Sequence, residues 1–223
     1  MSNTQPRLAA ARLVVAAVVA TLAAGAVAAP AAAQASAAAQ AAEPAFSPAD
    51  LHFISGMIVH HAQAVLMAGW APTHGASPAV RELCARIAVS QRDEMATMER
   101  WLRERHQALP DTSPSARLAA TAAMPGMAMA GGGPAMMPGM LTREQLVQLD
   151  SAHGPAFDRA FLTGMIQHHR GALTMVADYV NQPAAGEDTF VFQFASDVNG
   201  DQTAEIDRMS RMLAALSSAP RNP

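Results

Sequence analysis

Residues 53–68 read FISGMIVHHAQAVLMA, and residues 161–176 read FLTGMIQHHRGALTMV. The two stretches align without a gap and share a Gly-Met-Ile triplet, a His-His pair and a methionine six residues after that pair. A second match follows each copy, because Gln91, Glu94 and Met98 correspond to Gln202, Glu205 and Met209. An internal repeat of this kind predicts a duplicated structural unit. Since the repeat keeps histidine, methionine and glutamate in apolar surroundings, it also favours soft-metal chemistry.

Turn and capping residues divide the chain into helices. Ser47-Pro48 and Ser77-Pro78 are typical helix starts, and they predict helices that end near Trp70 and His106. Thr142 to Gln145 form a capping box for a short helix that ends near Ala152. Two further helices are predicted, from Gly154-Pro155 to about Val180 and from about Glu187 to Leu216. Strand signals are almost absent, so we expect an all-α protein.

These helices predict two antiparallel hairpins, because each long pair is joined by a short turn. One hairpin alone would leave its apolar stripe in water, so the two should pack together as a four-helix bundle. The expected organisation is a signal peptide at 1–35, a disordered tether at 36–46, hairpin repeat 1 at 47–108, a Pro/Gly/Met-rich linker at 109–140, hairpin repeat 2 at 141–216 and a disordered tail at 217–223, with 47–216 as one domain.

The first residues carry the features of a secretory signal. Arg7 and Arg12 precede an uncharged apolar run, and Ala33-Gln34-Ala35 offers a small-x-small cleavage site. The run is alanine-rich and no basic flank follows it, which argues against a membrane anchor. We therefore expect a periplasmic or secreted protein that has no membrane association after signal cleavage.

Composition excludes some partners. The net charge is −3, and the fifteen basic residues are all arginines scattered along the chain, so no stripe for nucleic acid is expected. The one cysteine, Cys84, allows no intrachain disulfide, and we interpret it as a small buried residue. Fifteen methionines are many for 223 residues.

Helical geometry places the repeated polar residues on the inward face. At about 100° per residue, Met57, His60 and His61 lie on or near one apolar stripe, and Glu94 falls in the stripe of the next helix. A buried carboxylate is costly unless it is paired, hydrogen-bonded or bound to a metal. One reading is that Glu94 and Glu205 only accept hydrogen bonds from histidines. The full set of imidazoles and thioethers favours metal binding, with each glutamate orienting an imidazole.

The linker supplies a second signal. Its six methionines lie among Pro and Gly without helical periodicity, and we therefore expect that they cannot belong to the core: Met124, Met127, Met129, Met136, Met137 and Met140. We interpret them as accessory residues for capture of Cu(I) or Ag(I) through sulfur, with compositional drift as the alternative. His52 and His74 are weaker accessory candidates, whereas His106 and His153 are read as surface or loop residues.

The G-M-I-x-H-H-x-x-A-x-x-M stretches at 56–67 and 164–175, each followed by Q-x-x-E-x-x-x-M, resemble domain-of-unknown-function family 305, which includes the CopM-like periplasmic copper-binding proteins. The resemblance covers about residues 47–215. It implies a ferritin-like four-helix bundle, export, and a role in copper homeostasis or tolerance. Carried over by position, the implied metal residues are Met57, His60, His61, Met67, Glu94, Met98, Met165, His168, His169, Met175, Glu205 and Met209.

We thus expect a non-enzymatic exported protein that binds copper, preferably Cu(I), with Ag(I) or Cu(II) as alternatives. Its partners would be metal ions and another periplasmic copper-handling protein. A metal-free structural or partner-binding bundle is the main alternative. A metalloenzyme is disfavoured because a di-iron site needs Glu-x-x-His pairs, which the bundle helices lack. A zinc site would leave the methionines unexplained.

Overall fold

The computed structural model describes residues 46–113, 136–183 and 185–218, and this part of the chain contains five helices and no strand. The helices are α2 (Pro48–Gly69), α3 (Pro78–Glu104), α5 (Arg143–Ser151), α6 (Pro155–Val180) and α7 (Thr189–Ser218). The prediction of an all-α protein is confirmed. The expected signal peptide, most of the expected tether and the first three linker methionines, Met124, Met127 and Met129, lie outside the described residues.

Capping residues begin the helices where the sequence predicts. Ser47 caps α2 in a capping box with Asp50, Ser77 caps α3, and Thr142 forms a capping box with Gln145 at the start of α5. Gly154 precedes α6 with a φ of 57°, a left-handed conformation that suits glycine. Asp188 accepts hydrogen bonds from the backbone N–H groups of Phe190 and Val191, so its carboxylate caps the first turn of α7.

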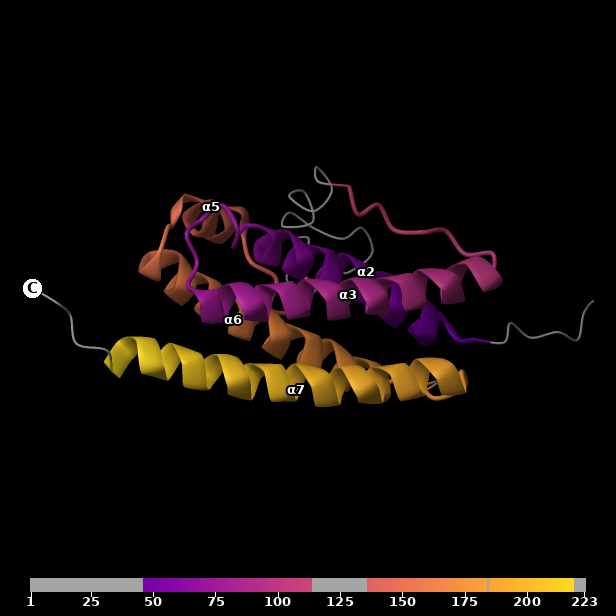
Figure 1. Cartoon of the computed structure of the whole chain (residues 1–223). Coiled ribbons are helices and arrows are strands. Elements are labelled where there is room, and N and C mark those ends of the chain that lie inside the picture. Colours follow the sequence, from indigo (N-terminus) through magenta and orange to yellow (C-terminus); the bar gives the residue numbers. More distant parts are fainter. Residues whose placement is uncertain (1–45, 114–135, 184, 219–223) are drawn as a thin grey trace, which may run out of the picture. The chain divides into compact units, whose positions relative to one another are not determined.

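Two helical pairs make up the fold (Figure 1). Helices α2 and α3 form the first pair, α6 and α7 form the second, and the pairs meet mainly through α2 and α6. The short helix α5 packs on α6, whereas contacts between α3 and α7 are sparser. Polar links tie the helix ends together. The Tyr179 hydroxyl donates to Asp50 over 2.6 Å, and the Trp101 indole N–H donates to Asp188 over 3.0 Å.

The apolar interior is divided into two clusters. The first apolar cluster includes Phe53, Trp101, Tyr179 and Val198, and it lies around the start of α2, the end of α3, the end of α6 and the start of α7. The second apolar cluster includes Leu83, Phe157 and Phe161, and it lies around the opposite helix ends. This division means that α2 and α6 cross in opposite directions, with the middle of each helix between the two clusters.

Helix α2 is also long and apolar enough to meet a length-and-composition test for a membrane span, alone among the described helices. Most of its apolar window is buried within the fold, as in the core helix of a water-soluble protein.

Candidate metal centre

Four fully buried histidines occupy the middle of α2 and α6, where the two apolar clusters meet. His60, His61, His168 and His169 each have 0% of their surface exposed. The rings of His60 and His168 lie with their centroids 3.8 Å apart, tilted by 38°, and the His168 and His169 rings are 6.1 Å apart. The repeat therefore brings its two His-His pairs together across the interface between the hairpins.

Each of these imidazoles uses its Nε2 atom in a hydrogen bond. His60 Nε2 donates to the carbonyl oxygen of Pro138 over 3.0 Å, and His168 Nε2 donates to the carbonyl oxygen of His60 over 3.0 Å. His61 Nε2 is 2.6 Å from a carboxylate oxygen of Glu94, and His169 Nε2 is 2.5 Å from that of Glu205. All four partners are acceptors, so the hydrogen on each ring belongs on Nε2.

The other nitrogen of each ring has no partner. Among the described residues, the buried side-chain atoms without a hydrogen bond include Nδ1 of all four histidines. Burial lowers the pKa of His60 to about 3, helped by the neighbouring His61, and burial also lowers the pKa of His168 well below its usual value. Both rings are neutral at pH 7, so their Nδ1 atoms carry free lone pairs. Histidines that bind metals have the same arrangement: one nitrogen coordinates the metal, and the other donates its hydrogen to a carboxylate or carbonyl oxygen.

The two glutamates lie at the margin of the core rather than inside it. Their side chains are 16% and 25% exposed in Glu94 and Glu205, respectively. Burial alone would raise the pKa of Glu94, but hydrogen bonds from His61 and Ser90 lower it overall. On the same side, partial burial and the charges of Glu94 and Glu205 raise the pKa of Asp201. The α3–α7 side of the histidine layer is therefore acidic.

The predicted methionines divide between the two apolar clusters. Met57 and Met98 of repeat 1 share the first cluster with Met175 of repeat 2. Met165 and Met209 of repeat 2 share the second cluster with Met67 of repeat 1. Each cluster thus combines methionine sulfur from both hairpins.

Two linker methionines contradict the expectation that this segment cannot belong to the core. Met137 and Met140 are each 2% exposed and belong to the first apolar cluster. Met136 is partly buried against the same cluster. The segment has no helical periodicity because residues Met137–Leu141, here called the strap, cross the helices through a turn at Pro138-Gly139 rather than joining a helix. It therefore buries side chains without a pattern that sequence analysis could recognise.

The arrangement constrains how a metal ion could be held. Within the described part of the chain, no group of three His, Cys, Asp or Glu side chains is placed to hold a metal ion. The four Nδ1 atoms without a hydrogen-bond partner offer lone pairs, but a complete ligand set would need donors of another kind. Thioether sulfur is the available donor in both clusters, and mixed nitrogen and sulfur ligation suits Cu(I).

Other sequence candidates lie away from this layer. His52 is exposed. His74 bridges a turn to α5, with Nε2 2.7 Å from the Asp150 carbonyl oxygen and Nδ1 2.9 Å from that of Trp70. Burial, aided by Asp158, raises the pKa of Cys84 to about 12, which disfavours a thiolate ligand. His74 therefore links two parts of the fold through hydrogen bonds, and Cys84 packs as a buried neutral side chain.

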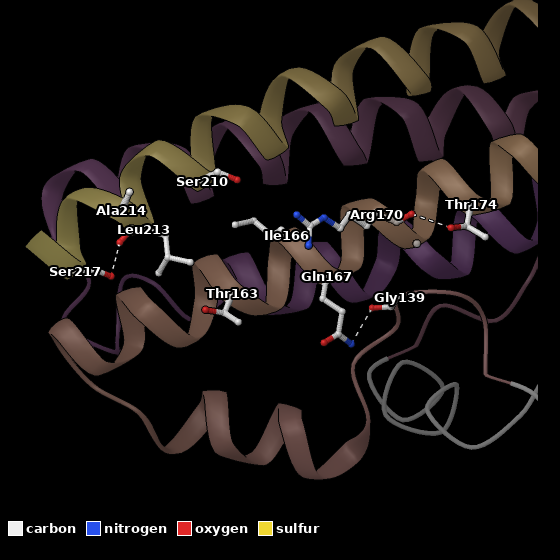
Figure 2. A pocket seen from close by; sticks show the side chains of 11 residues that line it. Gly139, Thr163, Ile166, Gln167, Arg170, Thr174, Ser210, Leu213, Ala214 and Ser217 are labelled. Atoms are coloured by element: carbon white, nitrogen blue, oxygen red, sulfur yellow. Dashed lines mark hydrogen bonds between the residues drawn. The ribbon is translucent and has the colours of Figure 1, made fainter.

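A groove of about 790 Å³ runs along α6 and α7 (Figure 2). Gln167 and Arg170 of α6, Ser210 and Leu213 of α7, and Gly139 are among its lining residues. Neither a histidine nor a methionine contributes to this lining, so the groove is separate from the histidine layer.

Sequence reasoning missed the polar residues that anchor the strap. The Gln63 side chain accepts from the Leu141 backbone N–H over 2.8 Å and donates to the Leu141 carbonyl oxygen over 3.1 Å. A fully buried glutamine in an apolar helix was the available signal, because such an amide requires partners.

Comparisons with known proteins agree with the fold. The family model described as "Domain of unknown function (DUF305)" matches residues 50–213. A DUF305 protein from Streptomyces coelicolor, described as secreted, is 25% identical, with a TM-score of 0.60 and coverage of 78% of this chain and 98% of that chain. A DUF305 fragment from Deinococcus radiodurans is 26% identical, with a TM-score of 0.60 and coverage of 76% and 98%. CopM in its Cu(II)-bound form is 26% identical, with a TM-score of 0.52 and coverage of 74% and 96%. No curated protein matches the chain.

Proposed function

Since this chain belongs to the DUF305 family, we propose that it binds copper between its two helical hairpins and serves copper homeostasis or tolerance. The proposal includes export to the periplasm or outside the cell, a ferritin-like bundle, and binding without catalysis. Metal ions are its partners, together with another copper-handling protein of the same compartment. The proposal includes no binding to nucleic acid and no association with a membrane after signal cleavage.

One observation carries the proposal: in all four buried histidines Nε2 donates to an acceptor, whereas Nδ1 has no hydrogen-bond partner. A buried polar atom without a hydrogen bond is destabilising by about 1–3 kcal/mol, so four equivalent cases in one layer require a reason. Metal coordination provides that reason because it uses the lone pair that each Nδ1 offers. The Cu(II)-bound form of CopM, a related fold, supports copper as the metal.

The donor set favours Cu(I), with Ag(I) and Cu(II) as further ions. Imidazole binds copper in both oxidation states, whereas thioether prefers the softer Cu(I) and Ag(I). The residues that would hold the ion are the four histidines and the methionines of the two clusters. Glu94 and Glu205 would orient His61 and His169 through their Nε2 atoms rather than bind the metal themselves.

A second candidate function is a metal-free helical bundle, and the same hydrogen bonds give it some support. His61 with Glu94 and His169 with Glu205 already satisfy one another's polar groups. In this case the histidine layer would serve only to pair buried polar groups, and methionine would act as adaptable packing.

Titration of the purified protein with Cu(I), without oxygen and against a competing chelator, separates the two candidates. We expect that a variant with His60, His61, His168 and His169 changed to Ala loses affinity by about 100-fold or more, because all imidazole ligands are gone. A matched variant with His52, His106 and His153 changed to Ala should bind as the native protein does, since these residues are exposed and lie outside the layer.

Helix content measured by circular dichroism must be equal in all three proteins. Two further variants, with only His60 and His168 or only His61 and His169 changed to Ala, cover the case in which the quadruple variant does not fold. Equal copper binding by the native and histidine-layer variants would move the site to the linker methionines. Absence of binding by the native protein would sink the copper proposal.

A further inference from the structure

The strap, residues Met137–Leu141, crosses the outside of the α2–α6 interface at the level of the histidine layer. Met137 and Met140 are buried in the first apolar cluster, whereas Leu141 is buried in the second. Pro138 follows Met137 in the chain, and its carbonyl oxygen accepts the hydrogen bond from His60. The strap therefore passes from one cluster to the other and touches the histidines on the way.

Both long helices at the interface hold the strap. Gln63 of α2 pairs with the backbone of Leu141 in both directions. Gln167 of α6 directs its amide at the carbonyl oxygen of Gly139, 3.4 Å away (Figure 2). The carbonyl oxygen of Met140 is also 3.4 Å from this amide. A Cβ atom on Gly139, whose φ is 71°, would lie 2.5 Å from the Gln167 carbonyl oxygen, and one on Gly171 would overlap the Pro138 carbonyl group. The strap backbone thus rests directly on the backbone of α6.

The two repeats differ at the positions that contact the strap. Gln63 in repeat 1 aligns with Gly171 in repeat 2, and Val59 in repeat 1 aligns with Gln167. The surrounding Gly, Met, Ile and His residues are identical. One helix supplies the glutamine that binds Leu141, and the other supplies the glycine that admits Pro138. The duplicated helices have therefore diverged so that a single strap fits across them.

The strap places different side chains over equivalent glycines. A Cβ atom on Gly56 would lie 3.8 Å from Sδ of Met137 and 3.4 Å from Cε of Met175. At the equivalent Gly164 it would lie 2.9 Å from a methyl carbon of Leu141. Each glycine precedes the first histidine of its pair by four residues, or about one helical turn on the same face. Sulfur thus stands one turn from His60, and a leucine takes the corresponding place before His168.

We propose that Met137 is a thioether ligand of the metal centre, held by the strap beside Met175 and His60. The inference rests on the proposed copper function. It makes the centre asymmetric, because the half near His60 has a strap sulfur that the half near His168 lacks. Met137 then acts from a fixed position inside the fold rather than as part of a flexible metal-capturing linker.

Silver titration combined with NMR of methionine methyl groups tests this role. Ag(I) is the probe because it prefers thioether and does not change oxidation state in the experiment. The Met137→Leu variant keeps the buried volume nearly constant while it removes sulfur. We expect it to lower Ag(I) affinity at least about tenfold, and we expect the methyl resonance of Met137 in the native protein to shift on addition of Ag(I).

Met140→Leu is the matched control, since Met140 belongs to the same strap and cluster but does not lie within 4 Å of the Gly56 position. Met140→Leu should change the Ag(I) affinity less than about threefold. Loss of a residue that supports a bound metal typically lowers the affinity by about 10-fold to 100-fold. Leu141→Met is the converse variant, and it should raise the affinity of the half near His168.

An unshifted Met137 resonance and native affinity in Met137→Leu, with binding still lost in the histidine-layer variant, would overturn the inference and leave the copper proposal intact. Absence of Ag(I) binding by the native protein would overturn both the role of Met137 and the proposed copper function.

Discussion

At the scale of single residues, the histidine layer depends on which ring nitrogen carries the hydrogen. Carbonyl oxygens of Pro138 and His60 can only accept, so they fix Nε2 as the donor in His60 and His168. The low pKa values that burial gives these rings keep them neutral. Backbone geometry therefore selects the tautomer that presents Nδ1, and a metal ion would not need to displace a proton from either ring.

The same two histidines should make the metal-free protein sensitive to acid. Burial lowers the His60 pKa from 6.5 to about 3, and it lowers that of His168 too. Below pH 6.5 the unfolded chain binds protons that the folded chain excludes, so stability present above that pH is lost as pH falls toward about 3. The loss is up to about 1.4 kcal/mol per pH unit for each histidine.

Urea unfolding of the chelator-treated protein between about pH 7.5 and pH 5 measures this dependence. The His60→Gln variant should show a shallower fall in the free energy of unfolding, because one of the two titrating groups is gone. A native protein whose stability stays constant over this range would contradict neutral burial of the histidines.

Several features of these residues were within reach of the sequence. Helical spacing placed His60, His61 and their repeat partners inward, and the capping expectations for Ser47, Ser77 and Thr142 are confirmed. Their hydrogen-bond partners were less accessible. The pairing of His61 with Glu94 was one of two readings. The partner of His60 is a backbone carbonyl, that of Pro138, which lies 78 residues from His60 and carries no side-chain signature.

At the scale of elements, the strap is where sequence reasoning failed. Helices can be read from period and caps because each turn repeats the same local geometry. The strap has no period, and its burial depends on Gln63, Gln167 and Gly171, which lie on two other elements. Its methionines were therefore predicted to be exposed, although the wider set of helices was predicted closely.

Close backbone contact between the strap and α6 gives a stability prediction. Gly171→Ala should lower the free energy of unfolding by about 2 kcal/mol or more, because its methyl group would overlap the Pro138 carbonyl and force the strap outward. Gly200→Ala in α7 is the matched control. A Cβ there meets nothing within 4 Å, so this change should stabilise the helix by about 0.5–1 kcal/mol. Thermal or urea unfolding measures both, and equal effects would contradict close strap packing.

At the scale of the whole molecule, the candidate centre belongs to neither hairpin alone. The His60 and His168 rings meet in a tilted arrangement across the hairpin interface, and each apolar cluster contains methionines of both repeats. The described helices agree with solved DUF305 proteins in fold, although identity is only 25–26%. An ion held between the hairpins would therefore join the two halves of the fold.

Metal binding should accordingly raise global stability. An ion that binds only the folded protein stabilises it by about 2.7 kcal/mol when its free concentration is 100 times the Kd. We expect Ag(I) to raise the Tm of the native protein and to leave that of the histidine-layer variant unchanged. Differential scanning calorimetry measures this effect. An unchanged native Tm at saturating Ag(I) would favour the metal-free bundle.

The histidine layer between the two apolar clusters also has a consequence for helix alignment. Apolar helix faces alone tolerate sliding, because one leucine or methionine replaces another. If α2 slid by one turn, about 5.4 Å, against α6, His60 would leave both Pro138 and the His168 ring and would move toward one of the two apolar clusters. The unpaired imidazole would disfavour that register, as a single polar residue does in a coiled coil. The layer therefore also fixes the register of the two hairpins, whether or not an ion is bound.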